Sequence, residues 1–159
     1  MNQIKSKERV KKLGEVFTND REVDAMLNLL PADEFLNPLA TFLEPACGTG
    51  NFLVAILRKK LSYADGLSEP EDIYSLKVLS SLYGVDIDCE NVQQTKSRLK
   101  ALMLELVNSS QAERFQAAID TILHTNIRQG DFLKGIEFQP YYWDGALVSS
   151  DGDNWQEAL

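Results

Sequence analysis

One glycine-containing stretch constrains the fold of this chain more than any other feature. Leu39–Leu43 is apolar and runs into Glu-Pro, which predicts a short buried strand ending in a turn. Residues 44–50 then read Glu-Pro-Ala-Cys-Gly-Thr-Gly. Asn51–Leu61 carries apolar side chains at helical spacing and ends in Arg-Lys-Lys, which suits the negative end of a helix dipole. A strand, a glycine turn and a helix in direct succession predict the first unit of a parallel α/β sheet.

The rest of the chain continues this alternation of helices and strands. Four further helices are predicted, over Asp20–Leu30, from Ser68-Glu69-Pro70 to Leu82, over Glu90–Val107 and from about Gln111 to Leu123. Asn19 or Asp20 is the cap expected for the first of them, and Pro31 stops it. Further strands are predicted over Tyr83–Asp88 and near Thr125–Gln129, and Trp143–Val148 is a candidate for a fourth. This order predicts an α/β fold with a mostly parallel sheet, right-handed crossovers and flanking helices, in which ligands bind at the carboxyl ends of the strands near the switch point.

Length and charge narrow the class of protein. The chain has 159 residues, of which 44% are hydrophobic, and this is enough for one globular domain with its own core. Lys and Arg total 16 against 24 Asp and Glu, giving a net charge of −8. Phosphate contacts need clustered cations, so we expect no self-sufficient nucleic-acid binder. The locally basic segment Lys5–Lys12 is interpreted as a solvated helix face or a chain terminus.

The sequence predicts neither a membrane segment nor a metal site. It contains no apolar run of about 18 residues and does not begin like a signal peptide, so we expect a cytoplasmic protein. Cys47 and Cys89 form neither a disulfide framework nor a metal-ligand spacing, and His124 is the single histidine. We interpret Cys47 as a small apolar side chain of the glycine turn and His124 as structural.

Candidate ligand-binding residues follow three predicted strands. Gly48 and Gly50 allow a sharp turn and close approach of a ligand to the backbone, where a Cβ would clash. Alone, they are equally typical of a tight strand-to-helix turn. Asp86 ends the second strand, where a carboxylate can accept both hydroxyls of a ribose, and Ile87 offers an apolar floor for a base. Asp88 is better explained as a helix cap.

The third strand ends in Asp131 and Phe132. A carboxylate at this position can accept the exocyclic amine of adenine, and an aromatic ring can cover the face of the base. Taken alone, Gly-Asp-Phe is a turn signal. The three strand-end signals in this order predict a nucleoside ligand.

From about Gly14 to Leu133 the sequence resembles the N6-adenine DNA methyltransferases of bacterial restriction–modification systems. Leu43–Leu53 is similar to that family's S-adenosylmethionine motif, and Gly14–Asn19 to its Gly-x-x-Phe-Thr-Pro element, with Asn19 in place of the proline. Tyr83–Asp88 resembles the ribose-binding strand, and Asn126–Leu133 resembles the adenine-contacting motif.

The resemblance implies S-adenosylmethionine as the cofactor and a Rossmann-like class I methyltransferase fold, here incomplete. We expect one such domain over residues 1–159, with a helical lead-in at 1–35, a cofactor-binding core at 39–135 and a C-terminal strand or tail at 136–159. The cofactor-binding residues that it implies are Phe17, Thr18, Glu44, Pro45, Ala46, Gly48, Gly50, Phe52, Asp86, Ile87, Asp131 and Phe132.

The catalytic motif that the resemblance implies is missing. The family carries Asn/Asp/Ser-Pro-Pro-Tyr/Phe after its fourth strand, where it holds the amine of a flipped-out base. Here Ser149–Gly152 stands at that position, and the sequence contains no Pro-Pro. Gln139–Tyr142 is a superficial lookalike that lies too close to Asp131 to leave room for a strand. Either the motif has degenerated in this chain, or Ile136–Leu159 is an insertion that precedes it. We therefore assign no catalytic residue.

Three functions remain open at this stage. The first is an S-adenosylmethionine-binding module of an adenine methyltransferase that is a fragment, or is completed by a second subunit or domain, and that reaches DNA only through that partner. The second is a catalytically inactive, methyltransferase-like interaction protein acting on a restriction–modification or DNA-binding partner. The third is a small-molecule methyltransferase, which is disfavoured because the sequence of residues 44–52 resembles that of DNA methyltransferases.

Overall fold

Three short parallel strands form the central sheet. The computed structural model describes residues 18–64, 69–138, 142–143 and 147–148. The strands β1 (Phe42–Glu44), β2 (Leu82–Asp86) and β3 (Ile127–Gln129) lie in the order β1-β2-β3, and both neighbouring pairs are parallel. The predicted parallel sheet is therefore confirmed. The order runs in one direction, so the expected switch point is not among the described strands.

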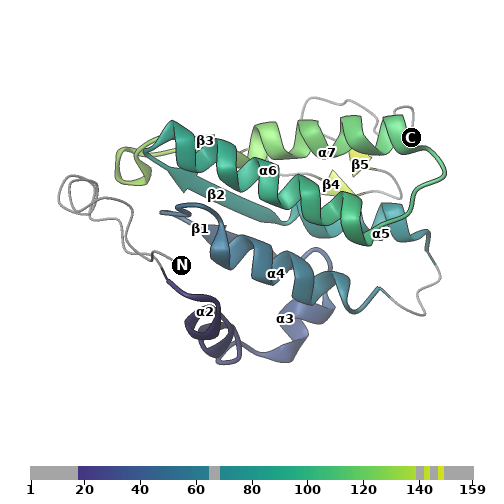
Figure 1. Ribbon diagram of the computed structural model, residues 1–159, viewed down its shortest axis with the longest axis horizontal. Coiled ribbons are helices and arrows are strands. Elements are labelled where there is room, and N and C mark those ends of the chain that lie inside the picture. The colour runs from purple at the N-terminus through teal and green to yellow at the C-terminus, as the bar shows by residue number, and fades with distance from the viewer. Residues whose placement is uncertain (1–17, 65–68, 139–141, 144–146, 149–159) are drawn as a thin grey trace.

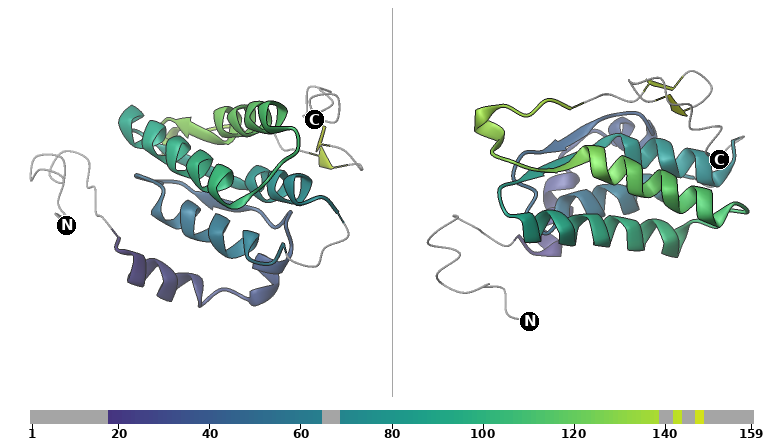
Figure 2. Two further views of the ribbon diagram at one scale, coloured as in Figure 1. Left: turned by 45° about the vertical axis from the view of Figure 1, so that its right-hand side comes forward. Right: turned by 90° about the horizontal axis from the view of Figure 1, so that it is seen from above.

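Helices α4 (Asn51–Leu61) and α6 (Cys89–Leu106) contact β2 and each other (Figure 1). Helices α5 (Glu71–Ser80) and α7 (Ala112–Asn126) pack together and also contact β2, and the view from above in Figure 2 shows α6 and α7 side by side. Helices α2 (Asp20–Leu27) and α3 (Ala32–Leu36) pack on α4. The fold is thus an α/β fold, as predicted, and no helix of the described residues is long and apolar enough to cross a membrane.

Local sequence signals explain where most helices begin. The Asn19 side chain accepts from the Glu22 N–H at 3.0 Å, and Glu22 reaches back to the Asn19 N–H, forming a capping box at the start of α2. Asp88 caps α6 by accepting from the Glu90 N–H at 2.8 Å, which confirms its interpretation as a helix cap. The prediction failed after α2. That helix ends at Leu27, not Leu30, and Pro31 precedes the unpredicted α3, since proline is compatible with a helix start.

The prediction of a fourth parallel strand over Trp143–Val148 is wrong. The structure has two separate strands there, β4 (Tyr142–Trp143) and β5 (Leu147–Val148). They pair with each other in antiparallel orientation and form a sheet of their own. The Asp-Gly that separates them in the sequence is a strong hairpin signal, and it outweighs the strand propensity of the flanking residues.

One face of the sheet packs on the helices far more than the other. Phe42 stacks on Phe35 of α3, with ring centroids 5.4 Å apart, and a Cβ added to Gly84 would lie 2.8 Å from Leu53 of α4. The opposite face carries Leu43, which is 47% exposed, and Tyr83, whose ring contacts Phe138 edge-on. Parallel sheets are normally buried on both faces. On this side of the sheet, Leu43 is therefore open within the described part of the chain, whereas Val85, which follows Tyr83 on the same side, is fully buried.

Two buried polar side chains connect elements that the sequence did not predict to meet. The ammonium of Lys60, which is fully buried, donates to the carbonyl oxygens of Pro38 and Ala40 and to the hydroxyl of Ser81, at 2.7–3.1 Å. Asn126 of α7 donates to the carbonyl oxygens of Ser80 and Leu82, both at 3.0 Å. These bonds hold the entry to β1 and the entry to β2 against α4 and α7.

Candidate functional site

The glycine turn connects β1 to α4 through two residues in the left-handed region. Gly48 has φ +54° and Gly50 has φ +85°, and Gly50 is the N-cap of α4. The Cys47 N–H donates to the Val85 carbonyl oxygen and the Gly50 N–H donates to the Cys47 carbonyl oxygen, both at 2.8 Å. No side chain caps α4 at Gly50, so the first turn of this helix presents N–H groups at the carboxyl edge of the sheet.

The two glycines of the turn differ in what surrounds them. A Cβ on Gly50 would lie 2.9 Å from Cγ2 and Oγ1 of Thr95, a fully buried side chain of α6. Gly50 therefore allows α4 and α6 to pack closely. A Cβ on Gly48 would have no atom within 4 Å. The space beside Gly48 is open, so this glycine fits the predicted close approach of a ligand, and for Gly50 that role stays a prediction.

Asp86, at the end of β2, holds the glycine turn in place. Its Oδ2 accepts from the Gly48 N–H at 2.8 Å, and its Oδ1 accepts from the Asp88 N–H at 2.8 Å and from Nδ2 of Asn91 at 3.3 Å. The structure thus joins two predicted site residues, Gly48 and Asp86, and gives the carboxylate a structural task that the sequence did not reveal. Each carboxylate oxygen can accept more than one bond, so this task leaves acceptor capacity.

Two polar residues of α6 that contact the turn, Thr95 and Arg98, were not predicted. Thr95 donates from Oγ1 to the Gly48 carbonyl oxygen at 3.0 Å. Arg98, one helical turn further along α6, donates to the Thr49 carbonyl oxygen at 2.6 Å and to Oδ1 of Asn51 at 2.7 Å. Thr95 is a polar residue on the buried face of α6 and Arg98 an exposed one, so neither position is distinguished in the sequence from ordinary helix residues. Together they fix the turn to α6.

The ends of β2 and β3 lie next to each other at the same edge. The Gly130 N–H donates to the Asp86 carbonyl oxygen at 2.9 Å, and Nε2 of Gln129 donates to the Ile87 carbonyl oxygen at 3.2 Å. Ile87 is 56% exposed, unusually open for an isoleucine that follows a buried strand. The predicted apolar floor is thus accessible to a ligand.

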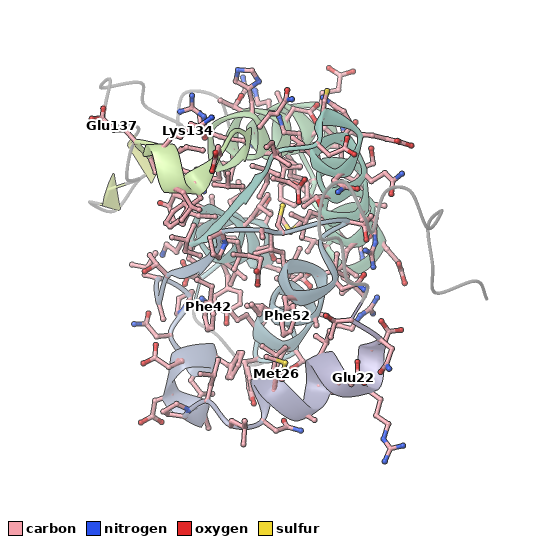
Figure 3. All side chains as sticks on the ribbon, turned by 90° about the vertical axis from the view of Figure 1, so that its left-hand side faces the viewer. Glu22, Met26, Phe42, Phe52, Lys134 and Glu137 are labelled. Atoms are coloured by element: carbon pink, nitrogen blue, oxygen red, sulfur yellow. The ribbon has the colours of Figure 1, made fainter. Side chains whose placement is uncertain are left out.

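Asp131 and Phe132 lie beyond β3, at a short 3₁₀ turn, η1 (Phe132–Lys134). The Asp131 carboxylate accepts from the Leu133 N–H at 3.1 Å and lies 3.5 Å from the ammonium of Lys134. A hollow of about 570 Å³ opens beside this segment, with Lys134 and Glu137 on its lining (Figure 3). The Asp131 side chain bonds only to residues of η1 in the described structure. This motif lies near Gly48 and Asp86 because the ends of β2 and β3 are adjacent.

The start of the turn is less buried than the strand before it. Pro45 and Ala46 are exposed, and Glu44 is half-buried. Burial raises the pKa of the Glu44 carboxyl above its usual value, and a bond from the Ala46 backbone partly offsets this.

A mostly apolar hollow of about 220 Å³ lies beside β1. Phe52, which is half-buried, lines it together with Phe42 and Met26 (Figure 3).

Of the predicted Phe-Thr element, only Thr18 can be placed. Its carbonyl oxygen accepts from Nδ2 of Asn51 at 2.7 Å, which brings the N-terminal lead-in to the first residue of α4. Phe17 lies outside the described residues, as do Ser149–Gly152 and most of Gln139–Tyr142.

The thiols contribute no visible catalytic group. Burial, with the nearby Asp86 carboxylate, raises the pKa of Cys47 to about 12, so this thiol is not a nucleophile at neutral pH. Cys89 is free and exposed on α6. Within the described residues, no group of His, Cys, Asp and Glu side chains has an arrangement suited to a metal ion.

Comparison with known proteins gives one informative match. Over 134 residues, the chain is 33% identical to a protein of Methanocaldococcus jannaschii described as a type II restriction enzyme and methyltransferase. The alignment covers 77% of this chain and 11% of that relative. The chain therefore spans about a tenth of the length of this distant restriction–modification relative. No family model matches the sequence, and no solved structure matches it.

Proposed function

We propose that this chain is the S-adenosylmethionine-binding module of a DNA adenine-N6 methyltransferase of a restriction–modification system. The observation that carries the proposal is the glycine turn at the carboxyl edge, with its open space beside Gly48 and its bond to Asp86. The distant similarity to a restriction enzyme and methyltransferase supports the same class.

The residues around the turn fit the chemistry of this cofactor. Its ribose needs acceptors, which Asp86 offers, and its adenine needs an apolar surface, which the exposed Ile87 offers beside the end of β3. Its methionine end carries an ammonium and its sulfur is cationic, so a carboxylate such as Glu44 is a favourable neighbour. The fit rests on these residues and on the Gly48 space, and Asp131 and Phe132 are assigned to the adenine only through the resemblance.

Methyl transfer to DNA requires groups that the described residues do not include. No carboxylate or amide with a following Pro-Pro-aromatic loop stands at this edge of the described sheet, and the sequence contains no Pro-Pro. We therefore propose that the catalytic loop, and sequence-specific DNA binding, come from a second methyltransferase subunit or domain. The net charge of −8 agrees with DNA recognition by that partner.

The outer edge of β1 is the place where we propose that this partner docks. Phe42 directs its N–H toward β2, where it donates to the Ser81 carbonyl oxygen at 2.9 Å. Because backbone groups alternate along a strand, those of Leu43 point away from β2 and toward the outer edge of β1. An open edge beside a mostly apolar hollow is suited to one added strand with apolar side chains.

Isothermal titration calorimetry with S-adenosylmethionine tests the cofactor assignment directly. We expect saturable binding by the folded chain, and weaker binding by Asp86→Asn, because an amide offers one acceptor oxygen where the carboxylate offers two. Circular dichroism of both proteins provides the control for folding. Absence of heat at high micromolar cofactor, with folded wild-type protein, would refute the proposal and favour the catalytically inactive interaction protein.

A further inference from the structure

A second polar groove lies away from the glycine turn, between α6, the end of α7 and β3. Its wider part has a volume of about 430 Å³ and adjoins a part of about 330 Å³, and both are lined by Gln93, Lys96 and His124. Cys89, Gln93, Lys96 and Lys100 follow one another at intervals of three or four residues, so they line one face of α6. The groove is therefore elongated along that helix.

The charge of this groove is opposite to that of the chain. The wider part is lined by Lys96, His124 and Arg128 and by no Asp or Glu, although acidic residues outnumber basic ones in the sequence by 24 to 16. In the narrower part, Lys100 is neutralised by a 2.7 Å bridge to Asp120. Uncompensated positive charge is thus concentrated at the β3 end of the groove.

The two cations at this end, Lys96 and Arg128, lack charged partners of their own within the described residues. Within the described residues, neither Lys96 nor His124 makes a hydrogen bond or an ion pair, and Lys96 is half-buried. Arg128 donates to the carbonyl oxygen of Glu137 at 3.2 Å, a neutral acceptor that positions the guanidinium without cancelling its charge. Burial lowers the pKa of Lys96; the Cys89 thiol opposes this and the Arg128 charge adds to it. An anion bound here would relieve that desolvation and repulsion.

The remaining lining side chains suit an oxyanion. Gln93 carries amide donors, and Gln129 keeps one amide hydrogen beyond the one that it donates to Ile87. A phosphate group accepts hydrogen bonds from ammonium, guanidinium and amide donors together. The open, elongated shape suits a polymer that passes through rather than a small anion that is enclosed.

We propose that Lys96, His124 and Arg128 bind a phosphate of a nucleic-acid backbone in the groove between α6, α7 and β3. This goes beyond the proposed cofactor site, whose ligand carries no phosphate. The contact is weak and independent of base sequence, because it uses only two cationic side chains, Lys96 and Arg128, on a chain whose net charge is −8. It adds to sequence-specific binding by a partner and does not replace it.

Binding of a short DNA duplex to the whole chain, followed by NMR and by fluorescence anisotropy at low salt (about 10 mM), tests this proposal. We expect the largest shift changes at Lys96, His124 and Arg128. Lys96→Met with Arg128→Met is expected to weaken binding about tenfold and to lower the slope of log affinity against log salt by roughly one for each phosphate that the variant no longer neutralises. Arg58→Met, at an exposed arginine of α4, removes a cation elsewhere and serves as the control.

Each result of these binding measurements either supports or overturns phosphate binding in the groove. The matched comparison is between Arg58→Met and Arg128→Met alone, since each removes one cation, and equal weakening by the two would show a diffuse charge effect and overturn the proposal. Binding of inorganic phosphate at these residues without binding of the duplex would overturn the nucleic-acid assignment. Thermal melting of each variant separates loss of binding from loss of the fold. Calorimetry with S-adenosylmethionine is independent of all these results, because no groove residue belongs to the cofactor site.

Discussion

At the scale of single residues, Gly48 and Gly50 share a motif but have different tasks. Gly50 allows two helices to approach, and Gly48 borders open space. Sequence alone shows that both positions need glycine but not why, because the partner of Gly50 is Thr95, far along the chain on another helix. The same limit applies to Asp86: its place at a strand end could be predicted, but its bonds to the Gly48 and Asp88 N–H groups depend on how the turn folds back.

Alanine substitution should therefore lower mainly the stability at Gly50 and mainly the cofactor affinity at Gly48. Gly50→Ala places a Cβ against a buried β-branched side chain at φ +85°, so we expect a loss of about 3 kcal/mol in unfolding free energy. Gly48→Ala has only the left-handed strain, about 1 kcal/mol, but its Cβ fills the proposed cofactor space. Urea denaturation measures the first effect, and calorimetry with S-adenosylmethionine should show at least a roughly tenfold loss for Gly48→Ala. Equal affinities of Gly48→Ala and wild type would remove Gly48 from the cofactor site.

At the scale of elements, local sequence signals were sufficient to predict the bounds of a helix where its start signal and its charge pattern agree. The predicted bounds of α4 match the structure because a glycine turn defines its start and a basic last turn its end. The third strand and the two helices after β2 were placed within a few residues. Failures occurred at 31–36, where a proline precedes a helix start, and at 143–148, where two paired strands are separated in the sequence by an Asp-Gly. The contacts of Lys60 with the entry to β1 could not be predicted, since they depend on tertiary packing.

Lys60 should make the stability of this helix–strand junction depend on pH. Burial lowers the pKa of Lys60 in the folded chain to about 8, from 10.5. Between these values the unfolded chain binds more protons than the folded one, so the contribution of Lys60 to stability rises with pH from about 8 to 10.5. We expect this rise in the difference in unfolding free energy between wild type and Lys60→Met, measured in urea across that range. A constant difference would show that Lys60 stays protonated in the folded state, held by its three oxygen partners.

At the scale of the whole molecule, the edge strand β1 is less covered than the central strand of the described sheet. Six helices lie in contact with α4, with each other or with one face of a three-stranded sheet, while Leu43 remains open at the edge and on the opposite face. Exposed apolar side chains gather in the same part of the chain: Met26, Leu29, Leu30, Leu36, Leu39 and Leu43. Three of them, Met26, Leu30 and Leu43, line the hollow beside β1. Isolated exposed leucines are ordinary on protein surfaces, but apolar side chains grouped beside a strand edge are typical of an interface.

Amide hydrogen exchange on the isolated chain tests whether that edge is free. The Leu43 amide points away from β2, so we expect it to exchange rapidly although it lies in a strand, whereas Val85, fully buried in the central strand, should exchange slowly. Adding a polypeptide that supplies the missing strand and catalytic loop should slow exchange at Leu43 and leave Val85 unchanged. Leu43→Lys should abolish that protection without changing the melting temperature, because its side chain is 47% exposed. Slow exchange at Leu43 in the monomer would mean that another part of this chain already covers β1, and slow exchange only at high concentration would assign the edge to a second copy.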